Sequence, residues 1–310
     1  CNDWHGSYRS QYLATRAIPF YSAPGCNAIS VAEYVISALV NLSERYLFDI
    51  TDKTVGIIGA GNTGTRVSEK LTVLGVEHCL CDPILANSGE DKRNFVSLEQ
   101  ALNCDVISLH VPKMLSGEHK TFHLLDAERL ASLRDSQILI NACRGEVIDN
   151  QALLSLKQNG HGLTLVLDVW EGEPNILMPL LPFTDIATAH IAGYSLEGKA
   201  RGTEMLYQAL CKQLDIPFKI SLTDCLPTPN ITSVTINADF DQNMLNRLVK
   251  MVYDIKRDDG IFRQQINELG FDHIRKHYPV RREFSSLVID NPDNYETGPL
   301  AGLGFNVLPQ

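Results

Sequence analysis

Residues 55–64 constrain the fold of this 310-residue chain more than any other segment. They read Val-Gly-Ile-Ile-Gly-Ala-Gly-Asn-Thr-Gly, an aliphatic run that leads directly into the spacing Gly59-x-Gly61-x-x-Gly64. The run is typical of a buried strand, and residues 62–74 have the pattern of a helix that follows the turn. Because Gly61 lacks a Cβ, a pyrophosphate can approach the backbone and the positive end of that helix. The segment therefore predicts a dinucleotide-binding turn.

An acidic residue stands where this kind of turn requires one. Asp82 closes a second short strand in the sequence Leu80-Cys81-Asp82-Pro83, and a carboxylate about twenty positions after the glycines can hold the ribose hydroxyls. Its charge would repel the additional phosphate of NADP, so NAD is the predicted cofactor. We expect Asn62 and Thr63, at the start of the helix, to contribute to phosphate binding.

Composition argues against several other classes of protein. The formal net charge of −10 speaks against a general nucleic-acid binder, and no apolar run reaches the ~20 residues of a membrane span. The eight cysteines form no C-x-x-C pair and no zinc spacing with histidine. We therefore expect free thiols in a reducing cytoplasm, no metal, and no nucleic-acid or membrane partner. A small anionic substrate stays compatible, because a few arginines can make one pocket positive.

Strand and helix patterns alternate along the first part of the chain, and residues 83–95 read as a polar loop. This alternation is the signature of an α/β fold with a parallel, doubly wound (Rossmann) sheet. The predicted strands are 54–58, 77–81, 106–111, 137–141, 163–168 and 186–188, and the predicted helices are 27–47 (capped by Asn27), 62–74, 97–102, 126–133 and 150–158.

The chain changes character from about residue 197. A helix over 197–214 and a proline-containing link over 226–230 lead to a separate α/β segment. There the pattern predicts a strand at 231–236, an amphipathic helix at 241–256 and a further strand at 284–289. This tail has no glycine cradle and no convergent acid–base set, so we expect it to serve association or to support the active site.

Four side chains follow predicted strands, where ligands bind in sheets of this kind. They are Arg144, Asp168, Glu173 and His190. His190 suits a general base because imidazole titrates near neutrality, and Glu173 can orient the ring. Arg144 offers a planar fork that matches a substrate carboxylate. We expect Asp168 to lie near the nicotinamide, although a solvated acid at a strand end is the alternative.

Each of these residues alone would be typical of a structural or surface position. Their joint occurrence at strand ends behind a dinucleotide turn favours chemistry instead. Hydride transfer from a secondary alcohol to NAD needs a base for the hydroxyl proton and a cation for the neighbouring carboxylate. The set therefore predicts the oxidation of a small hydroxy acid.

The order of these residues resembles that of the D-isomer-specific 2-hydroxyacid dehydrogenases, which carry an arginine, a glutamate before proline and a histidine. The resemblance covers nearly the whole chain. It is strongest toward the members that oxidise 4-phospho-D-erythronate with NAD in vitamin B6 biosynthesis. The stretches that carry it are 23–28, 141–145, 190–194 with 196–202, and 281–283 with 285–287.

This resemblance implies a role for each matching position. Arg144 and Glu173 would be active-site residues, His190 the proton donor, and Tyr194 a substrate contact, the substrate being a small phosphorylated hydroxy acid. The implied NAD contacts are Gly59, Gly61, Gly64, Asp82, Val111 (in the turn His110-Val111-Pro112, through its backbone only), Asp168 and Gly193.

The resemblance also implies a domain organisation. Residues 1–26 would be the remnant of a substrate domain, and 27–191 the NAD-binding domain. Residues 192–220 would return to the substrate domain, and 221–310 would form a C-terminal dimerisation domain, so we expect a homodimer.

The first nine residues do not resemble the family, whose members usually read Ala-Thr-Ile-Gly-Thr-Asp-His-Ile-Asp at this place. One possible coding of that peptide, read one nucleotide out of phase, translates into all nine residues of this chain. We therefore expect residues 1–10 to be an out-of-frame reading, with the frame restored before Tyr12 and the segment upstream missing. A divergent N-terminus is the alternative.

That missing segment resembles the part that supplies donors to the substrate's phosphate. We therefore expect NAD binding at best from this exact chain, with weak or no turnover. We also expect an exposed apolar face on the helix over 27–47, which would favour association.

Three other readings stay open. The chain can be another member of the family that acts on glycerate, phosphoglycerate or lactate, although the C-terminal segment argues against it. It can be a non-catalytic NAD-sensing binding protein, which the intact Arg144, Glu173 and His190 argue against. A decayed gene product without activity is the third. Arg281 and Arg282 are interpreted as surface charges rather than as substrate contacts across a dimer.

Overall fold

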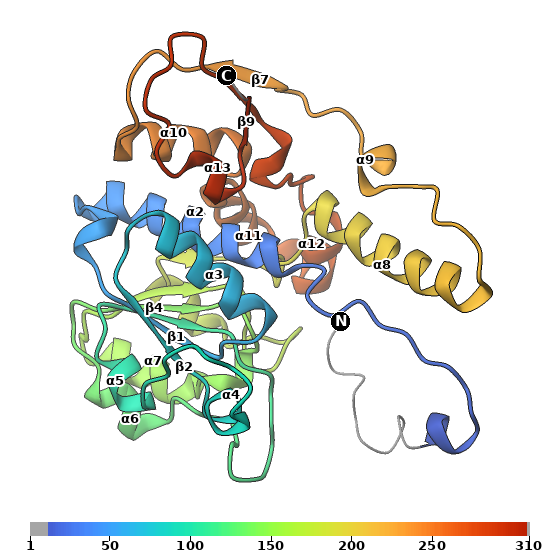
Figure 1. Ribbon diagram of the computed structural model, residues 1–310. Helices are drawn as coiled ribbons and strands as arrows, with labels where there is room; N and C mark the ends of the chain where they lie inside the picture. Colours follow the sequence, from blue (N-terminus) through green and yellow to red (C-terminus); the bar gives the residue numbers. More distant parts are fainter. Residues whose placement is uncertain (1–11, 309–310) are drawn as a thin grey trace.

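Six short strands form one all-parallel sheet in the computed structural model of the protein, which describes residues 12–308 (Figure 1). The expected out-of-frame segment, residues 1–10, lies outside the described residues. The strands are β1 (Val55–Ile58), β2 (His78–Cys81), β3 (Val106–Leu109), β4 (Ile138–Asn141), β5 (Thr164–Leu167) and β6 (Ile186–Ala187).

The order of the strands defines where a ligand can bind. The sheet runs β2-β1-β3-β4-β5-β6, so the chain passes from β1 to β2 on one side and then crosses to β3 on the other. In open parallel sheets, ligands bind outside the carboxyl ends of the strands at such a reversal. The glycine turn that follows β1 lies at this switch point, between β1 and β3.

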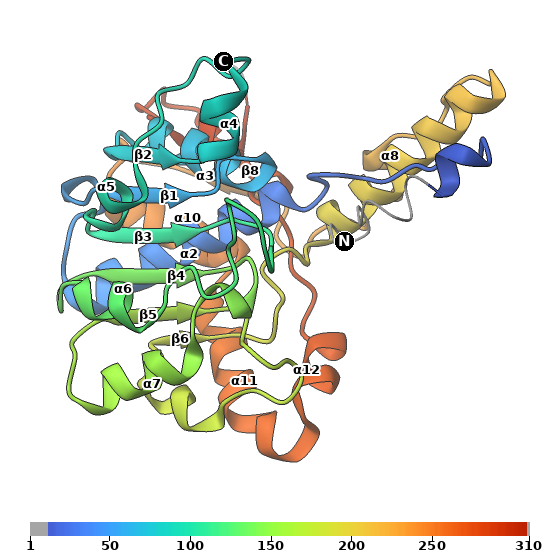
Figure 2. The ribbon, with the colours of Figure 1, turned by 90° about the horizontal axis from the view of Figure 1, so that it is seen from below.

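Helices cover both faces of the sheet, as a doubly wound fold requires (Figure 2). Ile57 and Ile140 belong to the core that α2 (Ala28–Tyr46) and α3 (Asn62–Val73) complete, whereas Ile58 and Leu139 belong to the core on the other face. The prediction of a Rossmann-like parallel sheet is confirmed. The remaining elements of this part are α4 (Pro83–Ser88), α5 (Leu98–Leu102), α6 (Ala127–Ser132), α7 (Asn150–Gln158) and the 3-10 turns η1 (Ile50–Asp52), η2 (Gly145–Val147) and η3 (Met178–Phe183).

The stretch predicted as a polar loop, 83–95, contains the short helix α4, so that prediction was wrong in part. Pro83 stands at the first helical position, where its missing N–H costs nothing. Asp82 caps the helix by accepting the N–H of Leu85 at 3.1 Å. The carboxylate expected to bind ribose therefore also starts a helix.

Helix α2 is buried over nearly its whole circumference, from Ala28 to Ser43 with Ile29 as the exception. The prediction of an exposed apolar face on this helix was wrong. The expected side-chain cap by Asn27 is also absent, although Asn27 does stand at the N-cap position.

The C-terminal segment packs on α2 and buries its outer face. Its side chains Leu245, Val249 and Phe284 share one core with α2 and α3, and Figure 1 shows this part above α2. The segment holds a small parallel sheet in the order β7-β8-β9. Its elements are β7 (Ser233–Thr235), α10 (Gln242–Val252), α11 (Ile255–Leu269), α12 (Phe271–His277), η4 (Phe284–Ser286), β8 (Val288–Asp290), α13 (Leu300–Leu303) and β9 (Asn306–Val307).

Two predictions for this segment need correction. The single helix expected over 241–256 is two helices, because the chain turns at Tyr253 and Asp254, and Asp254 starts α11 by accepting the N–H of Lys256. The strand expected over 284–289 begins as the turn η4 and becomes β8 only at Val288.

Helix α8 (Leu196–Leu214) extends away from the sheet, followed by the short α9 (Leu222–Cys225) (Figure 2). It exposes apolar side chains, among them Leu206, Leu210 and Leu214. Among the described residues, no helix combines the length and the apolar character needed to cross a membrane.

Candidate active site at the carboxyl edge of the sheet

The three glycines of the turn are required for different structural reasons. Gly59 has φ +94°, and a Cβ there would lie 2.6 Å from the carbonyl of His110. A Cβ at Gly64 would lie 1.9 Å from the carbonyl oxygen of Gly59, so α3 packs directly onto the turn. At Gly61, by contrast, a Cβ would meet no atom within 4 Å. The open space at Gly61 fits the approach of a pyrophosphate.

The start of α3 completes an anion site beside that space. Gly61 is the N-cap of the helix and no side chain caps it. The first intrahelical bond runs from Thr65 N–H to the Gly61 carbonyl, which leaves the N–H groups of Asn62, Thr63 and Gly64 without an intrahelical acceptor. These donors and the helix dipole favour a phosphate at this point. The expected roles of Asn62 and Thr63 stay predictions.

Asp82 and Arg93 hold the glycine turn from one side. Asp82 Oδ2 accepts the N–H of Ala60 at 2.9 Å, and Arg93 Nη2 donates to the Ala60 carbonyl at 2.9 Å. Arg93 is itself paired with Asp91 at 2.5 Å, so its charge is already balanced. Arg93 was missed in the sequence because its segment reads as a polar loop. Asp82 lies where a ribose-binding carboxylate is expected, but its contact with the cofactor stays a prediction.

The turn after β3 contributes backbone rather than reactive side chains. His110 is partly buried, and desolvation lowers the pKa of its imidazole to about 4, so the ring is neutral at physiological pH. Its Nε2 lies 2.8 Å from Ser108 Oγ. The side chain of Val111 is partly buried against the core below. Its expected backbone contact with NAD stays a prediction.

His190 and Glu173 form the central pair of the site. His190 Nδ1 lies 2.7 Å from Glu173 Oε2, and the other carboxylate oxygen, Oε1, accepts the N–H of Trp170 at 2.8 Å. Both side chains are partly exposed, at 27% and 19%. Because the carboxylate accepts the N–H of Nδ1, the ring presents Nε2 on its opposite side as the atom that can exchange a proton.

Asp168 fixes the backbone that carries His190. Its Oδ1 accepts the Thr188 hydroxyl at 2.7 Å and the Ile191 N–H at 2.8 Å, and its Oδ2 accepts the Ala192 N–H at 2.9 Å. Burial raises the pKa of this carboxyl, while the nearby His190 and these donors act in the opposite direction. Asp168 thereby holds His190 at a positive φ of 56°. Its predicted contact with NAD stays a prediction.

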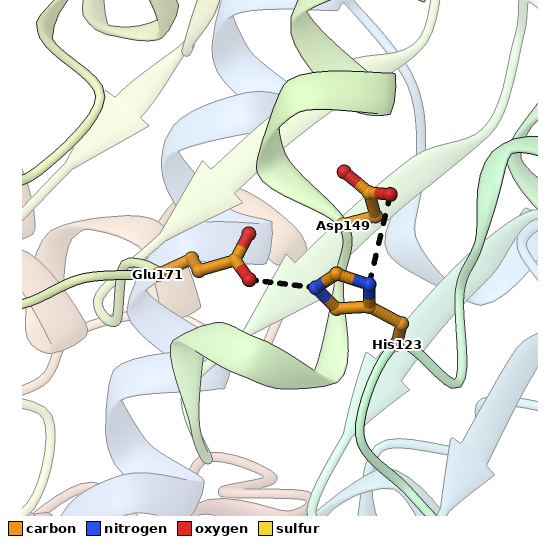
Figure 3. A group of neighbouring side chains, drawn as sticks. All are labelled: His123, Asp149 and Glu171. Carbon is orange, nitrogen blue, oxygen red and sulfur yellow. Dashed lines mark hydrogen bonds and ion pairs between the residues drawn. The ribbon is translucent and has the colours of Figure 1, made fainter.

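A second histidine holds the loop that carries Glu173, as Figure 3 shows. His123 Nε2 lies 2.6 Å from Glu171 Oε1, and His123 Nδ1 lies 3.6 Å from Asp149 Oδ2. The second oxygen of Glu171 accepts the N–H of Asn150 at 3.1 Å, and Asp149 caps α7 through the N–H of Ala152. The three side chains have the composition of a cation site, but both ring nitrogens and all four carboxylate oxygens already have a partner within the protein.

Arg144 lies at the end of β4, and its loop packs against that of Glu173. A Cβ at the next residue, Gly145, would lie 1.9 Å from the carbonyl carbon of Trp170, so the two loops touch backbone to backbone. Asn141 fixes the first loop by donating to the Arg144 carbonyl at 3.0 Å. The loops that follow β4, β5 and β6 therefore bring Arg144, Glu173 and His190 to the same edge of the sheet.

Tyr194 lies in an aromatic and cationic cluster four residues after His190. Its carbonyl accepts the hydroxyl of Tyr278 at 2.7 Å, and the two rings lie 5.6 Å apart. Lys199 Nζ lies over both rings, at 5.4 and 5.2 Å. A Cβ at Gly193 would lie 2.4 Å from Asn27 Nδ2, so this residue must be small where the loop meets α2. The substrate role of Tyr194 and the cofactor role of Gly193 stay predictions.

Arg281 was interpreted as a surface charge, and this was wrong. It is 1% exposed, donates to the carbonyls of Ala192 at 2.8 Å and Ser30 at 2.5 Å, and stacks on Tyr253 at 3.8 Å. Arg282 is also largely covered, because its Nε donates to Glu197 at 2.6 Å. No spacing in the sequence distinguishes these buried arginines from solvated ones.

Comparisons with known proteins agree with this geometry. Residues 33–192 match the description "D-isomer specific 2-hydroxyacid dehydrogenase, NAD binding domain", and residues 225–304 match a domain of unknown function. The chain is 60% identical to an erythronate-4-phosphate dehydrogenase of Colwellia psychrerythraea, over 95% of this chain and 77% of that protein. It is 53% identical to the enzyme of the same name from Tolumonas auensis, over 95% and 79%.

Solved structures support the fold alone. An NAD complex of a D-isomer specific 2-hydroxyacid dehydrogenase from Lactobacillus delbrueckii ssp. bulgaricus is 22% identical, with a TM-score of 0.50 over 65% of this chain and 70% of that one. A glyoxylate/hydroxypyruvate reductase from Sinorhizobium meliloti, in complex with NADP and malonate, is 24% identical, with a TM-score of 0.52 over 65% and 69%.

Proposed function

The chain belongs to the D-isomer specific 2-hydroxyacid dehydrogenase family and, within it, to the erythronate-4-phosphate dehydrogenases, and on this premise we propose its reaction. The substrate is 4-phospho-D-erythronate, which is oxidised with NAD to (R)-3-hydroxy-2-oxo-4-phosphooxybutanoate in pyridoxal 5'-phosphate biosynthesis. The observation that carries the proposal is the 2.7 Å contact between His190 and Glu173 at the edge of an NAD-binding sheet.

Bound NAD supplies the acceptor for the hydride that leaves C2 of the substrate. His190 Nε2 accepts the proton of the C2 hydroxyl, and Glu173 stabilises the imidazolium that results, because its carboxylate is held at Nδ1. Arg144 binds the substrate carboxylate through its guanidinium fork and orients C2 toward the histidine. In the reverse direction, His190 is the proton donor.

The residues proposed to hold NAD surround the switch point of the sheet. The N–H groups of Asn62, Thr63 and Gly64 bind the pyrophosphate beside Gly61, and Asp82 binds the ribose hydroxyls. The negative charge of Asp82 disfavours the additional phosphate of NADP. Val111, Asp168 and Gly193 complete the cofactor site, and Tyr194 contacts the substrate.

The proposed domains are 1–26 and 192–220 for the substrate side, 27–191 for NAD and 221–310 for dimerisation. The buried contacts between the C-terminal segment and α2 support its role in holding the NAD-binding part together. We propose a homodimer formed through 221–310. Sedimentation of the purified chain tests this, and a monomer at micromolar concentration would contradict it.

The reaction is tested by mixing the purified chain with NAD and a panel of acids: 4-phospho-D-erythronate, D-glycerate, 3-phosphoglycerate and D-lactate. Among the four acids, 4-phospho-D-erythronate should give the highest kcat/KM for NADH formation, even where turnover is slow, and a higher value for another acid would refute the substrate. Titration of NADH by fluorescence provides a separate readout of cofactor binding.

A further inference from the structure

Two thiols from separate segments lie side by side at the amino edge of the sheet, opposite the glycine turn. Cys79 is the second residue of β2, and Cys104 lies in the connection between α5 and β3. Their sulfur atoms are 3.6 Å apart. Among residues 12–308, no other two cysteine sulfurs lie within hydrogen-bonding distance of each other. This contact has no part in the chemistry proposed above.

Both cysteines border a pocket at the protein surface. Each cysteine is half-buried, and both line a surface pocket of about 220 Å³ together with Thr54, His78 and Asn103. A pocket of this size admits a small oxidant. By contrast, the other buried cysteines, Cys81, Cys143 and Cys211, are enclosed within the protein.

The two thiols differ in acidity, which indicates different roles in an oxidation step. Either thiol can donate to the other sulfur. When Cys79 is the donor, this bond lowers the pKa of Cys104 to about 7; desolvation opposes this effect, and a hydrogen bond from Thr54 adds to it. The same bond raises the pKa of Cys79. Because thiolates are the reactive form, Cys104 is the nucleophile and Cys79 the resolving thiol.

We propose that Cys79 and Cys104 form a reversible, redox-responsive disulfide when the protein meets a hydroperoxide. The Cys104 thiolate attacks one oxygen of the hydroperoxide, an S–O bond forms and the O–O bond breaks, which gives a sulfenic acid and a hydroxide or alkoxide that takes a proton from solvent. The sulfur of Cys79 then attacks the sulfenic sulfur, an S–S bond forms, and hydroxide leaves as water with the Cys79 proton. Two thiols lose two electrons, and the hydroperoxide gains them.

Little movement is needed for this step. A disulfide requires a sulfur separation of about 2.05 Å, so the two sulfurs must approach by about 1.6 Å from their 3.6 Å separation. Rotation of two side chains can supply this. The new bond would close the segment between positions 79 and 104, which includes Asp82 and Arg93, the two residues bonded to Ala60 of the glycine turn.

The test is peptide mapping of the purified chain after treatment with hydrogen peroxide, without reductant. We expect one linked peptide pair that joins Cys79 to Cys104, a mass loss of about 2 Da, and two fewer titratable thiols in denaturant. Dithiothreitol should restore both thiols. A link between other cysteines, or oxidation of Cys104 beyond the sulfenic acid with Cys79 left intact, would overturn the proposal.

Serine variants separate the roles of the two thiols. In Cys79→Ser the sulfenic acid on Cys104 should persist and react with dimedone, whereas in Cys104→Ser neither the link nor the adduct should form. Cys225→Ser is the matched control, because Cys225 is exposed and belongs to α9, and it should form the link at the wild-type rate. Equal dimedone labelling in Cys79→Ser and wild type would refute the resolving role. None of these readouts requires turnover.

Discussion

The open space at Gly61 leads to a sharp prediction about the variant Gly61→Ala. A Cβ there would have no neighbour within 4 Å, and the backbone is extended, with φ −71° and ψ −153°, outside the left-handed region that disfavours a Cβ. The variant should therefore fold, with a stability within about 1 kcal/mol of the wild type. The same methyl group occupies the volume into which the pyrophosphate must come.

The expected loss of affinity follows from the hydrogen bonds at the start of α3. A bond from a backbone N–H to a charged phosphate contributes about 1.5–3 kcal/mol. If the methyl group displaces the pyrophosphate far enough to break one of them, the Kd for NADH rises about 10- to 100-fold. Gly64→Ala should behave differently, because its Cβ would lie 1.9 Å from the Gly59 carbonyl oxygen. Overpacking of this kind costs about 1–3 kcal/mol or more.

The assay combines NADH fluorescence titration with thermal unfolding. Gly61→Ala should lose affinity with a nearly unchanged Tm, and Gly64→Ala should lower the Tm by about 2–5 °C. Gly260→Ala, in the middle of α11, is the control: its Cβ also meets nothing within 4 Å, and NADH affinity should not change. Wild-type affinity in Gly61→Ala would refute the placement of the pyrophosphate.

Three further predictions concern the active site and the core. Glu173→Gln should lower kcat about 10- to 100-fold, because an amide has one acceptor oxygen where the carboxylate serves both His190 and Trp170; Glu171→Gln, on the same loop, should cost less, and an equal loss would contradict this reasoning. Arg144→Lys should lower kcat/KM about 10- to 100-fold, mainly through KM, because lysine lacks the planar fork; an unchanged KM in the same NADH assay would count against the role of Arg144. Burial raises the pKa of Glu33 to about 8, although the nearby charge of Lys70 acts to lower it. Between pH 4.5 and 8 the unfolded chain has therefore lost this proton while the folded protein keeps it, so the free energy of unfolding falls as the pH rises. In urea unfolding, the free energy of unfolding of Glu33→Gln relative to the wild type should increase by ~2 kcal/mol between pH 6 and 8. Equal pH dependence of the two proteins would exclude a neutral Glu33.

The parallel sheet was predictable because its signals are local. Most strands of the first part are short aliphatic runs, and the predicted strands differ from the observed ones by one or two residues at their ends. The glycine spacing fixed the most important turn for the same reason. Steric conflicts at Gly59 and Gly64 are consequences of backbone geometry alone.

Predictions failed where segments distant in the sequence determine whether a residue is buried. Helix α2 was expected to expose an apolar face because the segment upstream was taken to be missing. Nothing in residues 27–47 indicates that α10 and α11 pack on this helix. The buried charges show the same limit. Arg281 lies in a charged stretch of sequence, yet the carbonyls of Ala192 and Ser30 and the ring of Tyr253 enclose it. The local sequence shows which side chains are charged. Which groups bind them in the interior depends on the fold.

The same limit explains why the support of Glu173 was missed. The reactive pair is visible in sequence because a glutamate before proline and a later histidine form a pattern. Its anchor is assembled from three loops: His123 follows β3, Asp149 precedes α7, and Glu171 follows β5. None of these is distinctive alone. The carboxylate of Glu173 must nevertheless be held to a fraction of an ångström for proton transfer, so the sequence specifies the chemistry locally and its precision through residues that only the fold brings together.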